Sequence, residues 1–324
     1  MELFRQILSI DSTSGREREL AEWLAGHLDA PQKELMEVGD GTLNLMLSWG
    51  NPKVVFCSHM DTVPPYIAPT FLPDRACGRG TCDAKGQFYA MYKACRRLTA
   101  MGRTDFGLLI LSGEETGSWG AKAFDRTGRG APLLVVGEPT DNKMVSASKG
   151  TKSFGLKFTG VPFHSGYPEN GVSAVDLFLE FMNKLEGATF PVDPLLGATT
   201  WNIGLLHSDN PQNILSPELT CRLYFRTTFA SDEAVTEWMR SQAGAFLEIE
   251  ERGGDSPARY LTLPGFPSAP VSFGSDAPHL NNFEHKIICG PGSVLVAHRN
   301  DEHLLREDFE KAVSNYISIY ESYN

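Results

Sequence analysis

Short apolar runs, each followed by polar or acidic residues, recur through the first half of the chain. They are Val54-Val55-Phe56, Leu108-Leu109-Ile110-Leu111 and Leu133-Leu134-Val135-Val136. Continuous apolar runs of this length predict strands that are buried on both faces, as in a parallel sheet. Because a doubly wound sheet binds its ligands at the carboxyl ends of its strands, the residues that follow these runs are expected to meet at one edge.

Between these runs the apolar residues follow a helical spacing. Helices are predicted over residues 1–8, from Ser14-Gly15 to about Leu28, and over residues 86–98, with a further strand over residues 43–48. This alternation of helices and strands indicates an α/β fold with a mixed, mostly parallel sheet flanked by helices.

The pattern changes near Lys149-Gly150. Residues 154–160 alternate between apolar and polar, which is typical of an antiparallel strand with one solvent-exposed face. The elements predicted after it are a helix over 173–185, strands over 200–205 and 219–228, and a helix over 232–246. This order fits the split β-α-β-β-α-β arrangement of a separate α+β domain. We therefore expect an inserted domain over 151–254 between two parts of the main domain, 1–150 and 255–324.

Composition narrows the function classes. The 324 residues are 41% hydrophobic and 21% charged, as in ordinary globular proteins, and the net charge of -11 with no Lys/Arg cluster argues against nucleic-acid binding. No apolar run is long enough to span a membrane, and the first eight residues lack the features of a signal peptide. Six cysteines without CxxC spacing indicate reduced thiols and a cytoplasmic location.

One imidazole and five carboxylates lie in the segments after the apolar runs. The segments are Ser58-His59-Met60-Asp61, Gly80-Thr81-Cys82-Asp83, Glu114-Glu115 and Gly137-Glu138. So many anions cannot share a dry crevice unless cations neutralise them, which predicts a metal site. The plainer interpretations are that Asp83 caps the helix that follows it and that Glu114-Glu115 is a solvated surface pair.

These ordered blocks, together with a late histidine in Ala297-His298-Arg299-Asn300-Asp301-Glu302, resemble the M20 family of co-catalytic metallohydrolases over nearly the whole chain. The resemblance implies a metal-peptidase-like catalytic domain with an inserted lid. It implies two divalent ions, zinc or cobalt, and a general acid/base that moves the proton of the attacking water. The implied roles are His59 and Glu138 on one ion, Glu115 and His298 on the other, Asp83 bridging both, Asp61 behind His59, and Glu114 as the general base.

The inserted domain carries a second set of residues that resembles the family. His164 resembles a histidine that stabilises the oxyanion, in dimeric members across the subunit boundary, while Asn213 and Arg226 resemble residues that bind the substrate carboxylate. Gly274-Ser275-Asp276 resembles a loop that lines the substrate pocket, and Gly274 and Ser275 are its expected site residues. The chain departs from the family in having Ser216 where a proline is usual and Pro162-Phe163 before His164.

The resemblance implies a cytoplasmic enzyme that hydrolyses the amide of an N-acyl amino acid. The branch it resembles most deacetylates acetylornithine, acetylcitrulline or acetyl-lysine, a role in amino-acid biosynthesis such as that of arginine. The alternative is a dipeptidase or carboxypeptidase of the same family. A metal-free binding protein would require lost ligands, and none of the five ligand positions is lost. The expected partners are a small N-acyl amino acid or short peptide, with neither nucleic acid nor membrane, and the lid leaves a homodimer open.

Overall fold

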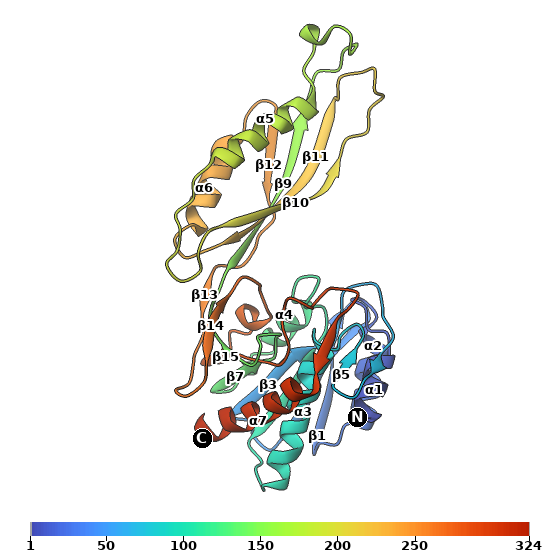
Figure 1. Cartoon of the computed structure of the whole chain (residues 1–324), viewed down its shortest axis with the longest axis vertical. Helices are drawn as coiled ribbons and strands as arrows, with labels where there is room; N and C mark the ends of the chain where they lie inside the picture. The colour runs from blue at the N-terminus through green and yellow to red at the C-terminus, as the bar shows by residue number, and fades with distance from the viewer. Residues whose placement is uncertain (1, 324) are drawn as a thin grey trace. The chain divides into compact units, whose positions relative to one another are not determined.

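The computed structural model describes residues 2–323, and Met1 and Asn324 lie outside the described residues. Within this range the chain forms two compact units (Figure 1). The first unit comprises residues 2–146, 260–269 and 275–323, and the second comprises residues 147–259 and 270–274. No helix of the described range is both long and apolar enough to cross a bilayer.

A six-stranded sheet with the order β1-β2-β6-β3-β7-β15 forms the centre of the first unit. Four adjacent strands run parallel: β6 (Phe106–Leu111), β3 (Val54–His59), β7 (Leu133–Val136) and β15 (His285–Ile288). The antiparallel pair β1 (Gln32–Gly39) and β2 (Thr42–Trp49) extends the sheet beyond β6. The mixed, mostly parallel sheet predicted from the apolar runs is thus confirmed.

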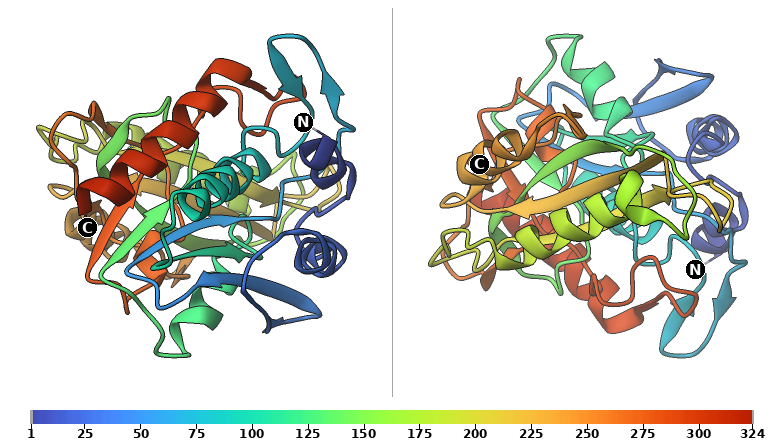
Figure 2. Two further views of the ribbon diagram at one scale, coloured as in Figure 1. Left: turned by 90° about the horizontal axis from the view of Figure 1, so that it is seen from below. Right: turned by 90° about the horizontal axis from the view of Figure 1, so that it is seen from above.

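Helices cover both faces of this sheet (Figure 2). One face packs in a single hydrophobic cluster with four helices, and α4 (Trp119–Asp125) lies on the other face. The four are α1 (Glu2–Ser9), α2 (Glu17–His27), α3 (Lys85–Ala100) and α7 (Arg306–Tyr323). These bounds agree with the first three helices predicted from the apolar spacing.

A small antiparallel sheet stands beside the start of α3 in the first unit. It consists of β4 (Thr70–Phe71), β5 (Arg75–Cys77) and β16 (His303–Leu305), and β5 pairs with both of the others. The register pairs His303 with Cys77, so the residues just before β16 lie opposite those just after β5. This pairing brings the late part of the chain to the loop that precedes α3.

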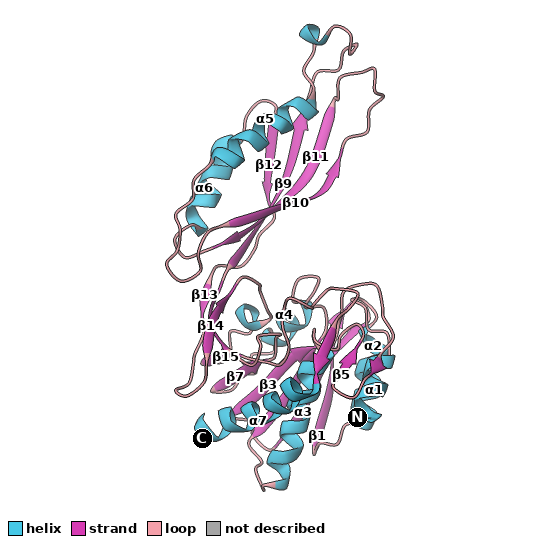
Figure 3. Ribbon diagram, in the orientation of Figure 1, coloured by secondary structure: helices cyan, strands magenta, loops and turns pink. Residues whose placement is uncertain are grey.

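The second unit is an antiparallel sheet with two helices on one face (Figure 3). Its elements follow the predicted β-α-β-β-α-β order: β9 (Gly150–Thr159), α5 (Ala174–Gly187), β10 (Thr200–His207), β11 (Glu218–Thr227), α6 (Asp232–Gln242) and β12 (Leu247–Glu251). Alternate residues of β9 and β11, such as Phe154, Leu156 and Leu223, are buried against α5 and α6. Three short strands, β8 (Met144–Ser148), β13 (Ala258–Arg259) and β14 (Ser268–Val271), form a sheet at the segments where the chain passes between the units.

Several elements were not predicted, and one predicted helix end was wrong. The edge strand β1 was not predicted, because most of its side chains are exposed and it therefore lacks a continuous apolar run. The helix predicted over 232–246 ends at Gln242. Gly244 and Leu247 then form a tight turn in which the N–H of each donates to the carbonyl of the other, and this turn starts β12.

Candidate metal centre

The ends of three neighbouring parallel strands place ionisable side chains at one edge of the main sheet. His59 is the last residue of β3, Glu114 and Glu115 follow β6, and Glu138 follows β7. Because β3 lies between β6 and β7 in the sheet, these segments are adjacent in space although they are far apart in the sequence.

Asp83 lies between two imidazoles. Its Oδ1 is 3.2 Å from Nε2 of His59, and its Oδ2 is 3.3 Å from Nε2 of His298. The carboxylate does not cap α3, whose N-cap is Ala84 without a side-chain cap hydrogen bond. Each Asp83 oxygen therefore faces a different imidazole, which is the geometry of a carboxylate that bridges two ions.

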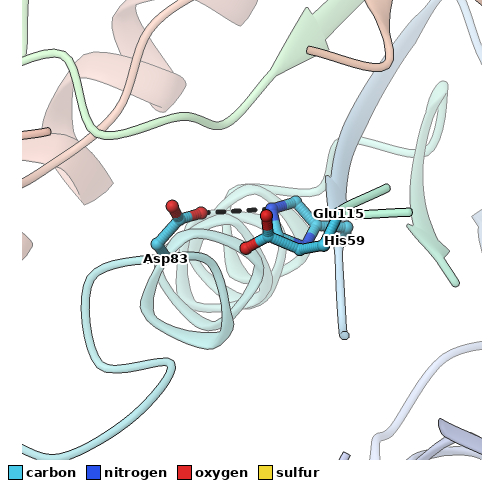
Figure 4. A group of neighbouring side chains, drawn as sticks. All are labelled: His59, Asp83 and Glu115. Carbon is cyan, nitrogen blue, oxygen red and sulfur yellow. Dashed lines mark hydrogen bonds and ion pairs between the residues drawn. The ribbon is translucent and has the colours of Figure 1, made fainter. Parts of the chain in front are cut away.

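Glu115 completes this group from the β6 side. One ligand atom from each of His59, Asp83 and Glu115 lies within 4.8 Å of the others (Figure 4). Glu115 Oε1 is also 3.0 Å from His298 Nε2. His298 has a φ of +62°, in the left-handed region that non-glycine residues rarely adopt, and such outliers cluster at functional sites.

Glu138 supplies a test of whether a cation fits. Its side chain is only 4% exposed, and its Oε1 has no hydrogen-bond partner among the described residues. Burial, followed by the nearby Glu114 carboxylate, raises the pKa of Glu138 well above its usual range. A buried carboxylate oxygen without a donor is costly, and a cation held with His59 would satisfy it. The donor set of imidazoles and carboxylates suits zinc.

Asp61 contacts both His59 and the turn that contains Glu114 and Glu115. Nδ1 of His59 is 3.0 Å from the Asp61 carbonyl oxygen and 3.3 Å from its carboxylate. The same carboxylate accepts the backbone N–H of Glu114 at 3.0 Å, that of Glu115 at 3.2 Å, and the hydroxyl of Ser14 at 2.9 Å. Although burial opposes it, these donors keep the pKa of Asp61 below its usual value. Asp61 therefore fixes the relative positions of His59 and the two glutamates.

The electrostatics of the group favour positive charge at its centre. Burial raises the pKa of Glu114 well above its usual value, and nearby carboxylates add to this effect. Hydrogen bonds to Asp83 and Glu115 raise the pKa of His298 to about 10. Burial opposes protonation of His59, yet hydrogen bonds to Asp61 and Asp83 raise its pKa well above the usual range. The carboxylates around both imidazoles thus favour a positive charge at the centre of the group.

One acid beside the site was not among the predicted site residues. Asp276 is 2% exposed, its Oδ1 has no hydrogen-bond partner among the described residues, and burial raises its pKa to about 6. It directly follows the predicted pair Gly274 and Ser275, so its position in that motif was the available signal. Ser275 is buried, whereas Gly274 is exposed and belongs to the second unit.

The predicted residues of the second unit fall into two places. His164 and Asn213 lie together, because His164 forms a β-bridge with Ile214 and Ser165 donates its N–H to the Asn213 carbonyl at 3.0 Å. His164 is exposed, and its Nδ1 accepts the N–H of Gly166 at 3.0 Å.

Arg226 lies at the other end of the same sheet. It pairs with Thr151 at the start of β9, whereas the His164 loop follows Thr159 at its end. At about 3.4 Å per residue, the eight steps from Thr151 to Thr159 span roughly 27 Å. Within one chain, His164 and Arg226 therefore cannot contact the same small substrate through this unit.

Comparison with known proteins shows what this arrangement is similar to. The sequence profile of peptidase family M20/M25/M40 matches residues 55–322. A peptidase M20 domain-containing protein of Schizosaccharomyces pombe is 30% identical, with 97% of this chain and 82% of the relative aligned. A probable carboxypeptidase of Uncinocarpus reesii is also 30% identical, with 98% and 85% aligned.

Solved structures share the fold. A tripeptidase from Staphylococcus aureus superposes with a TM-score of 0.80 at 20% identity, covering 98% of this chain and 96% of that one. An M20 family metallo-carboxypeptidase from Sulfolobus solfataricus superposes with a TM-score of 0.77 at 16% identity, covering 98% and 97%.

Proposed function

Because the chain belongs to peptidase family M20/M25/M40 and is therefore a hydrolase of amide bonds, we propose that it is a two-metal carboxypeptidase that acts on short peptides. The observation that carries the proposal is the placement of Asp83. Its two oxygens face His59 and His298, and His298 also has the Glu115 carboxylate at 3.0 Å. The charges of Glu138 and His59 interact, which supports Glu138 as the further ligand on the His59 side.

Two divalent ions, zinc in the first instance, would be held by these five side chains. Two divalent metal ions, when bound, activate a water molecule and polarise the scissile carbonyl. We assign to Glu114 the role of accepting a proton from the attacking water and returning it to the leaving amine; its position in the same turn as Glu115 and a pKa raised by burial support this role. Asp61 orients His59 and both glutamates through its hydrogen bonds.

Loss of the bridging carboxylate tests the metal centre directly. Asp83→Ala is expected to lose both ions, because the two sites share this ligand, and elemental analysis of dialysed protein would measure the loss. Asp301→Ala is a matched control. Asp301 lies in the loop of His298, but its exposed carboxylate pairs with Arg299 at 2.8 Å. A variant Asp83→Ala that keeps two ions would contradict the bridging role.

A pair of cations in the second unit supports recognition of a free carboxyl end. Lys149 is 7% exposed, donates to the carbonyl of Ala198, and has its pKa lowered by burial and by the nearby charge of Arg226. The Arg226 guanidinium lies 5.1 Å from the centre of the Tyr224 ring. In the part of the chain that the structure describes, no acidic side chain forms an ion pair with either cation. Two unpaired cations suit a substrate carboxylate.

A free carboxylate next to the scissile amide is common to carboxypeptidase substrates and to N-acyl amino acids. The relatives favour the peptidase, since the Uncinocarpus reesii relative is named a probable carboxypeptidase and the Staphylococcus aureus structure a tripeptidase. We therefore prefer the peptidase alternative to the N-acyl amino acid deacetylase.

Three substrates that share one leucine separate these activities: Ala-Leu, Ala-Leu amide and N-acetyl-Leu, each assayed with zinc-loaded enzyme. We expect Ala-Leu to be hydrolysed, with kcat/KM at least about tenfold above that for N-acetyl-Leu. The amide should lose at least a further factor of about ten, because it removes one charge-assisted contact. Preference for N-acetyl-Leu would establish the deacetylase instead, and equal rates for Ala-Leu and its amide would exclude carboxylate recognition.

A further inference from the structure

A buried ion pair lies directly behind the candidate bridging ligand. Arg79 is 2% exposed and Glu302 is fully buried, and their Nη1 and Oε2 atoms are 2.6 Å apart. Arg79 lies in the loop between β5 and α3, and Glu302 immediately precedes β16. The β5–β16 pairing sets this position, since Gly78 donates its N–H to the Glu302 carbonyl at 3.0 Å.

The second oxygen of Glu302 contacts the ligand loop itself. Oε1 accepts the backbone N–H of Cys82 at 3.0 Å and that of Asp83 at 3.1 Å. These two bonds fix the peptide that carries the Asp83 side chain. The direction in which Asp83 presents its two oxygens therefore depends on the Glu302 carboxylate.

Arg79 ties two further loops to the same point. Its Nη1 donates to the carbonyl of Arg299 at 3.2 Å, next to His298, and its Nε donates to the carbonyl of Pro65 at 3.3 Å, in the segment after Asp61. The Arg79 guanidinium thus connects the segments that carry Asp61 and His298 to Glu302, which binds the Asp83 loop.

Stability alone does not account for this pair. A buried ion pair is often no more stabilising than two apolar residues of the same volume, because both charges lose their hydration. An apolar side chain, however, cannot accept the two N–H groups of the ligand loop. We propose that Glu302, held in place by Arg79, is a positioning residue that sets the geometry of Asp83 for both ions; this role rests on the proposed metal centre.

The test compares zinc affinity with folding stability in four variants of the full-length chain. They are Glu302→Gln, Arg79→Met, the double variant, and Leu98→Ala as a control. Leu98 is fully buried in α3, and its truncation destabilises the same unit without touching a ligand. Urea unfolding of metal-stripped protein gives the stability, and competition with a chromophoric chelator gives the zinc affinity.

Glu302→Gln is expected to weaken zinc binding by about 10- to 100-fold, the usual effect of losing a partner of a metal ligand. The glutamine amide has one acceptor oxygen and one NH2 group, so it cannot accept from the two N–H groups and from Arg79 at once. At one of these contacts its NH2 group would face another hydrogen-bond donor. The double variant removes that conflict and should recover at least about tenfold of the lost affinity. Leu98→Ala should unfold at lower urea yet bind zinc within about threefold of wild type.

Three outcomes would overturn the proposal. One is wild-type zinc affinity in Glu302→Gln. The second is a zinc affinity that falls in Leu98→Ala as much as in Glu302→Gln, which would make the pair a general stabilising element. The third is a double variant no better than Glu302→Gln. If Glu302→Gln cannot be purified, Arg79→Met answers the question, because it removes the cation that holds Glu302. It should weaken zinc binding, and wild-type zinc affinity in Arg79→Met would overturn the proposal. Wild-type protein that takes up no zinc would instead contradict the metal centre.

Discussion

Glu114 and Glu115 lie in one turn, and the Asp61 carboxylate accepts the backbone N–H groups of both. Their side chains nevertheless have different surroundings. Glu115 reaches His298 at 3.0 Å, whereas burial among other carboxylates raises the pKa of Glu114. Glu114→Gln should keep two ions and lower kcat by at least about 100-fold, the usual contribution of a general acid/base. Glu115→Gln should lose the ion held with His298.

Elemental analysis and kcat measured on the same two proteins separate these roles. The two variants differ by one position and remove the same chemical group, so each serves as the control of the other. If Glu114→Gln lost an ion while Glu115→Gln kept both, the two assignments would be exchanged.

If the proposed metal centre binds zinc, its histidines should make zinc affinity depend on pH. A ligand imidazole must be neutral, whereas contacts with Asp83 and Glu115 raise the pKa of His298 to about 10. Zinc must therefore displace a proton from His298 below this pH, and its affinity should rise with pH by up to about tenfold per unit for each proton displaced. Calorimetric titrations in buffers with different protonation enthalpies would count these protons, and affinity that stays constant from pH 6.5 to 8.5 would contradict the prediction.

In metal-free protein, the raised pKa of His298 should make the free energy of unfolding fall as the pH rises, whereas zinc affinity rises with pH. Because the pKa of His298 is higher in the folded chain than its ordinary 6.5, its ion pairs stabilise the fold fully below pH 6.5. That contribution is lost as the pH rises through about 10.

Residue types and order were enough to predict which side chains gather at the strand ends. His59 and Glu115 stand in short motifs after apolar runs, and Asp83 stands just before a predicted helix. The structure brings one ligand atom of each within 4.8 Å of the others. Glu302 was not predicted, because its contacts with Cys82 and Asp83 are made to backbone N–H groups. Such contacts leave no pattern in the side chains of the partner segment, so only the fold reveals them.

At the scale of elements, prediction succeeded where a segment buries a face and failed where it does not. Strand β7 has the bounds expected from its apolar run, because all four of its residues are buried. Strand β1 is an edge with mostly exposed side chains, so its sequence carries little hydrophobic pattern. The same reasoning explains why the ends of helices such as α6 are less predictable than their middles.

The first turn of α3 packs against the loop that carries Asp83 too closely for a side chain at Gly86. A Cβ atom there would lie 2.0 Å from the Thr81 carbonyl oxygen and 2.8 Å from a Leu304 methyl carbon. Gly86→Ala should therefore lower the free energy of unfolding by about 1–3 kcal/mol and weaken zinc binding by displacing the loop. Urea unfolding and zinc titration would measure the two effects.

Gly26 in α2 provides the matched control, because a Cβ atom there would meet nothing within 4 Å. Gly26→Ala should raise the free energy of unfolding by about 0.5–1 kcal/mol, since alanine favours a helix interior, and should leave zinc binding unchanged. If both substitutions acted alike, close packing of the Asp83 loop would not be the cause.

At the scale of the whole molecule, the separation of His164 from Arg226 along one sheet bears on subunit organisation. If both residues serve one substrate, they must come from different chains, so we expect a dimer with shared sites. His164→Ala should lower kcat by about 100- to 1000-fold, as for other lost oxyanion donors, with both ions retained. Mixing it with inactive Glu114→Gln should restore activity, because some sites then combine an intact His164 with an intact Glu114.

Exchange of subunits, followed by mass spectrometry of differently tagged chains, is the control for the mixing experiment. Demonstrated exchange without recovery of activity would place His164 and Glu114 of one site in the same chain. Wild-type kcat in His164→Ala would make this exposed histidine a surface residue.

The chain leaves the first unit after Ser146 and returns to it at Tyr260, and these two residues are hydrogen-bonded neighbours, with the Tyr260 N–H donating to the Ser146 carbonyl at 3.2 Å. The segment 147–259, which is most of the second unit, therefore departs and returns at one joint, while residues 270–274 are a separate short part of that unit. All five candidate metal ligands lie outside that segment. Replacement of segment 147–259 by recombination would exchange Lys149 and Arg226, the residues proposed to bind the substrate carboxylate. It would not interrupt a strand of the main sheet. If the proposed roles hold, replacing this segment changes the choice of substrate and leaves the candidate metal ligands as they are.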